Sequence, residues 1–259
     1  MADRSLAARR GATRAALAIA LAVPLLGGCA APAPPAAAPE PSFPAPAATP
    51  AAGDTRPSPG RYPASAATAK RAQVEVHDGP GGAVTRRLAS PLPSGAPLTF
   101  LVAGRRDDWL KVHLPVRPNG STGWVGTADV TVKGVPWRVD VHLGAHQLRL
   151  YESGRLSATY PIGVGTGTTP TPGGTFYLKE LLRPPDPDGA YGPFAYGLSG
   201  FSATLDCFKG QDAVIGLHGT NEPDSIGRDV SHGCIRLRNR DITALAEKLP
   251  LGTPVRILG

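Results

Sequence analysis

The residues with the clearest chemical potential are a cysteine and a histidine near the C-terminal end of the chain. Cys234 follows Gly233, and His218 ends an apolar run that begins at Ala213. A thiol attacks a carbonyl effectively only as the thiolate, and a nearby imidazole is the usual group that keeps it ionised near neutral pH. A glycine before the cysteine leaves room for a carbonyl to reach the sulfur and the local backbone N–H groups. This pattern predicts an acyl-transfer site.

Structural and metal-binding roles are the alternatives for these side chains. A lone cysteine is often a small buried hydrophobe, and a histidine at the end of a strand is often a structural residue. Zinc favours the ligand types that the chain offers at Cys207, His218, His232 and Cys234. Because the sequence has no paired Cys-x-x-Cys segment, we expect no metal site, and the acyl-transfer chemistry requires no organic cofactor.

A longer pattern surrounds the two residues. Residues 231–236 read Ser-His-Gly-Cys-Ile-Arg and follow His-Gly-Thr at 218–220, which resembles the signature of the YkuD-type L,D-transpeptidase catalytic domain. His218 and Cys234 lie sixteen positions apart, within the usual spacing of that family. The resemblance implies that His218 is the general base for Cys234 and that the carbonyl of Gly219 orients the imidazole. A carbonyl can accept the Nδ1 hydrogen and fix the tautomer as a carboxylate would.

Other residues of the same segment are expected to support the site. The backbone N–H groups around Gly233 and Cys234 are the expected donors to an oxyanion. We interpret Ser231 and His232 as supports that shape the loop by hydrogen bonding, with a secondary part in the oxyanion region.

Three residues are expected to contact the substrate, namely Thr220, Arg228 and Arg236. The resemblance implies that Thr220, Ile226, Gly227 and Arg228 line or brace the site. Arg236 either holds a substrate carboxylate or braces the loop through backbone carbonyls, and the sequence does not choose between these two roles.

The resemblance also implies a substrate and a reaction. Cys234 would attack the diamino acid carbonyl at the third position of a peptidoglycan tetrapeptide stem, release D-alanine and form a thioester. The side-chain amine of a second stem would then take the acyl group and give a 3→3 cross-link. Trapping of the same cysteine by carbapenems is a further implication of the resemblance.

Two other function classes remain as alternatives. If water takes the acyl group, the protein is an L,D-carboxypeptidase or a cysteine endopeptidase that trims wall peptides; the amine of a protein to be anchored to the wall is another possible acceptor. A non-catalytic wall-binding lipoprotein is the second class, and the intact pair of His218 and Cys234 argues against it.

Length and composition fit one or two modest soluble domains. The chain has 259 residues, 41% of them hydrophobic, and a formal net charge of +7. A mildly basic surface suits an anionic cell wall or membrane face, and no feature indicates a nucleic-acid partner.

The amino terminus predicts export and a lipid anchor. Residues 1–28 combine a basic start with an apolar stretch from Ala15 to Leu26, which is typical of a signal peptide and short for a membrane span. The tetrad that ends in Cys29 resembles a bacterial lipobox, so Cys29 is the expected lipidation site; the alternative is an ordinary signal peptide with an incidental cysteine. The protein would then face the cell wall or periplasm, held to the membrane only through this lipid. The Pro/Ala-rich residues 29–69 are interpreted as a disordered tether.

Cys207 has no role in this scheme. A disulfide with Cys234 would silence the enzyme, so we interpret Cys207 as an unpaired, small packing residue.

The remaining sequence predicts a mostly β protein. Short strands with Gly/Pro punctuation over residues 70–134 predict a small β-barrel that resembles a bacterial SH3-like domain, with residues 117–125 its most distinctive piece. Such a module either binds wall peptides or packs on the catalytic domain as a spacer. Residues 136–259 form the expected β-rich catalytic domain of the YkuD type, with one or two short helices.

Two segments of the second domain carry specific expectations. Residues 239–249 predict a helix with Asn239 as its cap and with one apolar face, formed by Ile242, Leu245, Ala246 and Leu249. Residues 183–201 are rich in Pro, Gly and aromatic residues and are interpreted either as a mobile lid or as an irregular surface loop.

Overall fold

The computed structural model describes residues 64–208 and 210–259. The predicted signal peptide, the lipidation site at Cys29 and the tether up to residue 63 lie outside these residues. Within the described part of the chain, no helix is long and apolar enough to cross a membrane.

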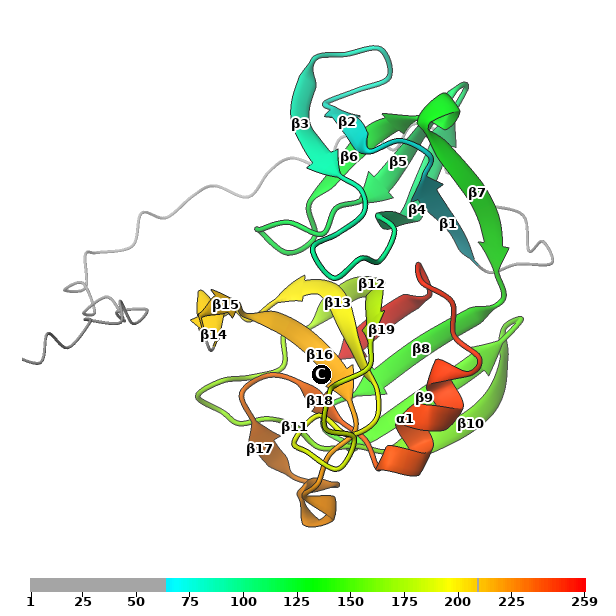
Figure 1. Ribbon diagram of the computed structural model, residues 1–259. Coiled ribbons are helices and arrows are strands. Elements are labelled where there is room, and N and C mark those ends of the chain that lie inside the picture. The colour runs from blue at the N-terminus through cyan, green and yellow to red at the C-terminus, as the bar shows by residue number, and fades with distance from the viewer. Residues whose placement is uncertain (1–63, 209) are drawn as a thin grey trace, which may run out of the picture. The chain divides into compact units, whose positions relative to one another are not determined.

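The first part of the described chain forms a seven-stranded sheet in the order β3-β2-β6-β5-β4-β1-β7 (Figure 1). Alternate residues such as Val74 and Val76 are buried while their neighbours are not, which is the pattern of strands with one face in a core. The strands are β1 (Ala64–Ala69), β2 (Gln73–His77), β3 (Val84–Ala89), β4 (Thr99–Arg106), β5 (Trp109–His113), β6 (Thr122–Gly126) and β7 (Val130–Val135), with a 3₁₀ turn η1 (Thr127–Asp129).

Strand β1 corrects the expected end of the tether. The sequence prediction extended disorder to residue 69, but β1 pairs with β4 and with β7 near the end of the sheet. Its residues are Ala, Ser and Thr, a composition shared with the Pro/Ala-rich segment before it. Ala66 and Ala67 are buried, because small side chains suit a strand that packs closely against its surroundings. The likeness of this sheet to an SH3-like barrel remains a prediction.

The second part of the chain forms an eight-stranded sheet in the order β10-β9-β8-β19-β12-β13-β16-β18 (Figure 1). The change from the first sheet to the second comes between Val135 and Trp137, at the predicted domain boundary. The strands are β8 (Trp137–His142), β9 (Gln147–Glu152), β10 (Arg155–Pro161), β12 (Gly174–Leu182), β13 (Ala195–Phe201), β16 (Val214–His218), β18 (Ile235–Arg236) and β19 (Pro254–Leu258).

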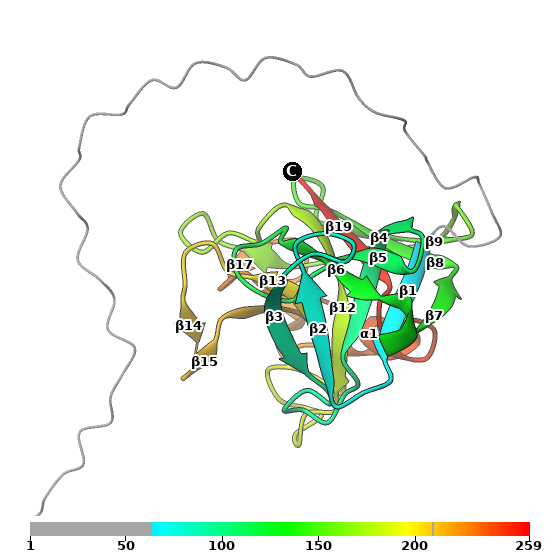
Figure 2. The same cartoon turned by 90° about the horizontal axis from the view of Figure 1, so that it is seen from above.

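Two small sheets and one helix complete this part. Strands β11 (Val164–Gly165) and β17 (Asp229–Ser231) pair in parallel, and β14 (Cys207–Phe208) pairs with β15 (Gln211–Asp212) in a hairpin. Figure 2 shows the hairpin at one side of the ribbon. The 3₁₀ turn η2 (Pro223–Ser225) lies between β16 and β17. The described residues are therefore mostly β, as predicted.

The helix α1 (Asn239–Ala246) closes the second core. Ile242, Leu245 and Leu249 are buried as predicted, although the helix ends three residues early. The predicted cap is wrong: the N-cap position is Arg238, without a side-chain cap bond. The side chain of Asn239 has a different partner, described below.

The segment 183–201 is only partly irregular. Residues 195–201 form β13 between β12 and β16, so the interpretation as one continuous lid or loop is wrong there. Tyr196 is fully buried and donates its hydroxyl hydrogen to the carbonyl of Leu249 at 2.8 Å, because a buried phenol needs a polar partner.

Candidate active site

Two parallel strands bring the predicted nucleophile and base to the same place. Strands β16 and β18 pair in the register Leu217 with Ile235 and His218 with Arg236, so Cys234 lies at the level of Gly216. A Cβ atom built on Gly216 would lie 3.5 Å from the Cys234 sulfur and 3.3 Å from Cδ2 of His218. The absence of a side chain at Gly216 therefore lets the thiol and the imidazole share one space.

The thiol of Cys234 receives a hydrogen bond from the backbone. The N–H of Gly216 donates to Sγ at 3.3 Å. Burial raises the pKa of the Cys234 thiol above its ordinary value, whereas this hydrogen bond and the charge of Arg236 act in the opposite direction and favour the thiolate. The net shift is upward, so the resting group is a neutral thiol.

The imidazole of His218 is buried and held by its neighbour. Its Nδ1 lies 2.5 Å from the carbonyl oxygen of Gly219. Because a carbonyl only accepts, Nδ1 carries the hydrogen and Nε2 has a free lone pair. Burial lowers the pKa of His218 to about 4, with the charge of Arg236 acting in the same direction against the Gly219 bond. The ring is therefore a neutral base at physiological pH, in the tautomer that the resemblance implied.

Among the described residues, Sγ of Cys234 is bonded to the N–H of Gly216 and the ring of His218 to Gly219, and these two side chains make no hydrogen bond to each other. Catalytic hydrogen bonds are often long in a protein without substrate and tighten only in the complex. Both groups line the same cavity, so the arrangement brings base and nucleophile together without ionising either of them.

The loop before β18 is fixed by Ser231, as predicted. Its hydroxyl donates to the carbonyl of Cys234 at 2.6 Å and accepts from the N–H of Gly233 at 3.1 Å. Gly233 has φ +112°, and a Cβ there would also lie 3.1 Å from Ile215 Cδ1, so glycine is required. Ser231 accepts the hydrogen of the Gly233 N–H in this structure, so we expect the N–H of Cys234 to be the nearer donor to an oxyanion. The part of Gly233 in the oxyanion region stays a prediction.

Threonines before β12 support the same loop and were not identified from the sequence. Thr171 donates its hydroxyl hydrogen to the carbonyl of Gly233 at 2.9 Å and accepts from the N–H of Gly165 at 2.9 Å. Thr169 donates to the carbonyl of Ser231 at 3.1 Å. The only signal in the sequence is the run of threonines at 166–171.

Asn239 holds the segment after His218. Its Oδ1 accepts from the N–H of Thr220 at 2.8 Å. A Cβ on Gly219 would come within 2.4 Å of this oxygen and 3.0 Å of Gly192 Cα, so only glycine fits between them. The peptide group that joins Gly219 to Thr220 carries the carbonyl that orients His218. It is held by the hydrogen bond to Asn239 and by close packing against Gly192.

The cavity at Cys234 has a volume of about 270 Å³. Tyr191 packs its ring edge-on against His218, with 4.9 Å between ring centroids. His232 is exposed and lies against Phe208, with 5.4 Å between centroids, rather than hydrogen bonding within the loop as predicted. The lining residues are Ala190, Tyr191, Leu205, Phe208, Ala213, Val214, Ile215, His218, Ser231, His232, Cys234 and Arg236.

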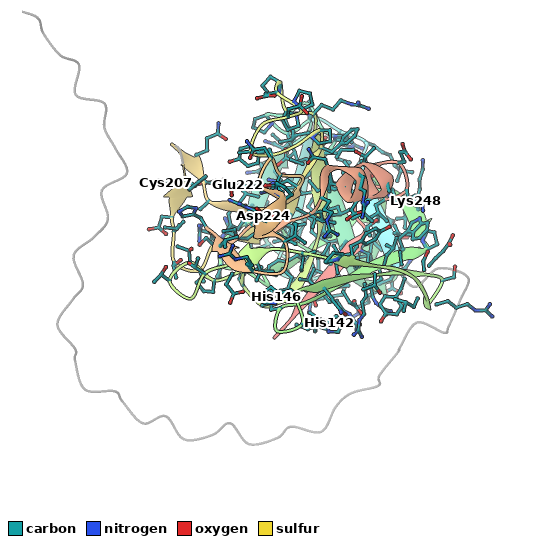
Figure 3. All side chains as sticks on the ribbon, turned by 90° about the horizontal axis from the view of Figure 1, so that it is seen from below. His142, His146, Cys207, Glu222, Asp224 and Lys248 are labelled. Carbon is teal, nitrogen blue, oxygen red and sulfur yellow. The ribbon has the colours of Figure 1, made fainter. Side chains whose placement is uncertain are left out.

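Arg236 lines the cavity and pairs with Glu222, labelled in Figure 3. Glu222 is a partner that the sequence did not indicate, and both predicted roles of Arg236 stay predictions. The other two predicted substrate-binding residues do not line this cavity. Thr220 is buried, with its hydroxyl accepting from the N–H of Glu222, and Arg228 lines a separate hollow beside η2.

Cys207 differs from its predicted state. Its side chain has an interaction partner, so it is not the unpaired packing residue of the prediction, and it lies on the β14–β15 hairpin (Figure 3). Among the described residues the free cysteine is Cys234, so the nucleophile is not engaged in a disulfide. The described residues contain no cluster of three or more His, Cys, Asp or Glu side chains suited to a metal ion.

Known proteins are similar to the part of the chain that contains this site. The model of the YkuD family, the L,D-transpeptidase catalytic domain, matches residues 136–257. A Bacillus subtilis protein named as the L,D-transpeptidase YkuD is 35% identical over 150 residues, which cover 56% of this chain and 83% of that protein. The chain belongs to the YkuD-type L,D-transpeptidase family.

Other similar proteins carry the same family name. The YkuD protein of Bacillus licheniformis is 44% identical over 123 residues, covering 48% of this chain and 66% of that relative. A solved L,D-transpeptidase from Mycobacterium smegmatis is similar at 15% identity over 61% of this chain and 80% of that one, with a TM-score of 0.41.

Proposed function

We propose that the protein is a peptidoglycan L,D-transpeptidase that forms 3→3 cross-links through a thioester on Cys234. The observation that carries this proposal is the placement of a free thiol and a neutral, oriented imidazole next to Gly216 in one cavity. Membership of the YkuD family supports peptidoglycan peptides as the substrate class. A tetrapeptide stem is the acyl donor in this proposal.

The first half-reaction makes the thioester. Nε2 of His218 takes the proton of the Cys234 thiol as the sulfur attacks the third-residue carbonyl of the donor stem. The N–H of Cys234 donates to the oxyanion of the tetrahedral intermediate. His218 then gives the proton to the nitrogen of the leaving D-alanine, the C–N bond breaks, and the acyl group remains on sulfur.

The second half-reaction transfers the acyl group. The side-chain amine of an acceptor stem attacks the thioester carbonyl and gives up a proton to His218. The C–S bond breaks, the thiolate recovers that proton, and a new amide links the two stems. The neutral state of His218 at physiological pH suits it to accept a proton in both halves.

The outcome of the second half depends on which acceptor reaches the thioester. Water in place of the amine gives L,D-carboxypeptidase or endopeptidase products, and a protein amine gives an anchored protein. Incubating the purified chain with disaccharide-tetrapeptide and separating the products by mass spectrometry distinguishes cross-linking from hydrolysis. We expect a cross-linked dimer and free D-alanine, and Cys234→Ala should give neither. Tripeptide alone would make the protein a hydrolase. The absence of any product would instead support a wall-binding role.

The same chemistry extends the proposal to carbapenems. Attack of Sγ on the β-lactam carbonyl breaks the ring C–N bond, and the ring nitrogen takes the proton from His218. The adduct adds the full mass of the drug to the chain. Intact-mass spectra of the wild type should contain this adduct and those of Cys234→Ala should lack it.

The proposed location rests on the sequence. A lipid on Cys29 would hold the protein to the membrane on its outer face, close to the wall. Cys29→Ala should release the protein from the membrane fraction. A variant that stays with the membrane would contradict lipid anchoring at this residue.

A further inference from the structure

A loop of the first sheet reaches the backbone that forms one wall of the catalytic cavity. Arg117, in the β5–β6 loop, donates from Nη1 to the carbonyl of Ser202 at 3.0 Å and from Nη2 to that of Leu205 at 2.9 Å. The same nitrogen lies 3.4 Å from the carbonyl of Asp206. One guanidinium therefore holds carbonyls from both ends of a single turn.

Asn119 binds the residue just before that turn. Its Nδ2 donates to the carbonyl of Phe201 at 2.8 Å, and the N–H of Phe201 donates to its Oδ1 at 2.9 Å. These reciprocal bonds mimic a neighbouring strand at the end of β13 and fix which way the amide points. The guanidinium of Arg117 also lies over the Phe201 ring, 4.9 Å from its centroid.

Two of these four carbonyls belong to buried residues and therefore require hydrogen-bond partners within the protein. Phe201 and Ser202 are buried, at 6% and 1% exposure, and a buried carbonyl without a hydrogen bond costs free energy. Arg117 and Asn119 supply these partners from a sheet that contributes no residue to the cavity lining.

The turn that they hold carries the cavity wall. Residues 202–206 connect β13 to the β14–β15 hairpin, and Leu205 and Phe208 line the cavity together with Cys234. Within the turn, Ser202 donates its N–H to the carbonyl of Ala213, which begins the return to β16. A shift of this turn would therefore move cavity-lining residues on β14 and on β16 together.

We propose that Arg117 and Asn119 are positioning residues that fix this wall and thereby set the affinity of the cavity for the acyl donor. The first sheet then contributes to substrate binding without touching the substrate. This goes beyond the proposed function and beyond the expected choice between a wall-peptide binder and a spacer.

The test uses Arg117→Ala and Asn119→Asp in the full chain. The aspartate retains the acceptor for the Phe201 N–H but places a carboxylate oxygen against the Phe201 carbonyl. Arg86→Ala is the matched control, because Arg86 is an exposed arginine on edge strand β3 of the same sheet. Steady-state kinetics with a tetrapeptide donor and amide hydrogen exchange of residues 201–206 are the two readouts.

Loss of one or two hydrogen bonds of about 1 kcal/mol each corresponds to roughly a five- to thirtyfold rise in donor KM, with kcat within about twofold. Exchange at residues 201–206 should be faster by a similar factor, and Arg86→Ala should change neither quantity. Arg117→Lys should fall between wild type and alanine, since one ammonium replaces the fork of the guanidinium.

Several results would overturn the proposal. These are an unchanged KM and exchange rate in the two folded variants, a change in kcat alone, or an equal effect from Arg86→Ala. If Arg117→Ala fails to fold, Arg117→Lys carries the same comparison. If the wild type turns over no donor, the proposed function fails separately, and exchange at residues 201–206 together with the alkylation rate of Cys234 by neutral reagents still decides the positioning role.

Discussion

The side chain of His218 and the carbonyl of Gly219 are neighbours in sequence and bound to each other, with Nδ1 and O 2.5 Å apart. This contact fixes the ring so that the free lone pair is on Nε2, while burial keeps the ring uncharged. Burial also raises the pKa of the Cys234 thiol and so favours its uncharged form. The pair is therefore arranged for proton transfer during the attack, rather than for a permanent thiolate–imidazolium ion pair.

The burial of His218 predicts a specific loss of stability in mild acid. Its pKa is about 4 in the folded protein and about 6.5 in an unfolded chain, so the unfolded state binds more protons between these values. Stability is fully present above pH 6.5 and falls as the pH decreases toward 4, by on the order of 3 kcal/mol. Urea unfolding at several pH values measures this, and His218→Gln should flatten the curve in that window. Equal slopes for the two proteins would contradict the assignment.

Gly216→Ala should impair the reaction more than the fold. The new Cβ would lie 3.3 Å from the His218 ring and 3.5 Å from the Cys234 sulfur, close to both reacting groups. Gly216 does not have a positive φ, so alanine adds no backbone strain. We expect acylation by a carbapenem to slow by roughly tenfold, the equivalent of about 1.4 kcal/mol, while the melting temperature stays within a few degrees. Gly144→Ala, at a glycine with open space around it, is the control.

The reacting pair could be predicted from the sequence because its parts are local. His218 ends a strand, Cys234 precedes another, and the six-residue segment around the cysteine contains its own support in Ser231. The helix face at Ile242 and Leu245 follows in the same way from helical periodicity.

What the sequence could not supply are contacts between distant segments. Thr171 and Asn239 hold the site across 62 and 19 positions, and neither residue type indicates such a partner. Asn239 appeared as a helix cap because asparagine favours that position, but its amide is used by Thr220 instead. Strand β1 was missed for a related reason, since Ala and Ser in a strand have the same composition as a linker.

Ser231→Ala tests the support of the catalytic loop. The change removes both the donor to the Cys234 carbonyl and the acceptor for the Gly233 N–H, and it leaves two buried groups without partners. The cost should be about 1–3 kcal/mol in the free energy of unfolding, with slower acylation. Ser157→Ala, on the exposed face of β10, should change neither quantity. A Ser231 variant with wild-type stability and acylation rate would show that Thr171 and Thr169 suffice to hold the loop.

Glu222→Gln separates the two roles of Arg236 that the sequence left open. Glu222 is exposed and neutralises a guanidinium whose charge favours the thiolate of Cys234 and faces the cavity. Removing the carboxylate should lower the pKa of the Cys234 thiol, so alkylation by iodoacetamide at pH 7 should become faster. If Arg236 also holds a carboxylate of the donor, the donor KM should fall, because the internal competitor has gone. Asp224→Asn, an exposed neighbour on η2, provides the comparison. Faster alkylation with an unchanged KM would assign Arg236 to the thiolate alone, and no change in either would reduce the ion pair to a brace of the loop.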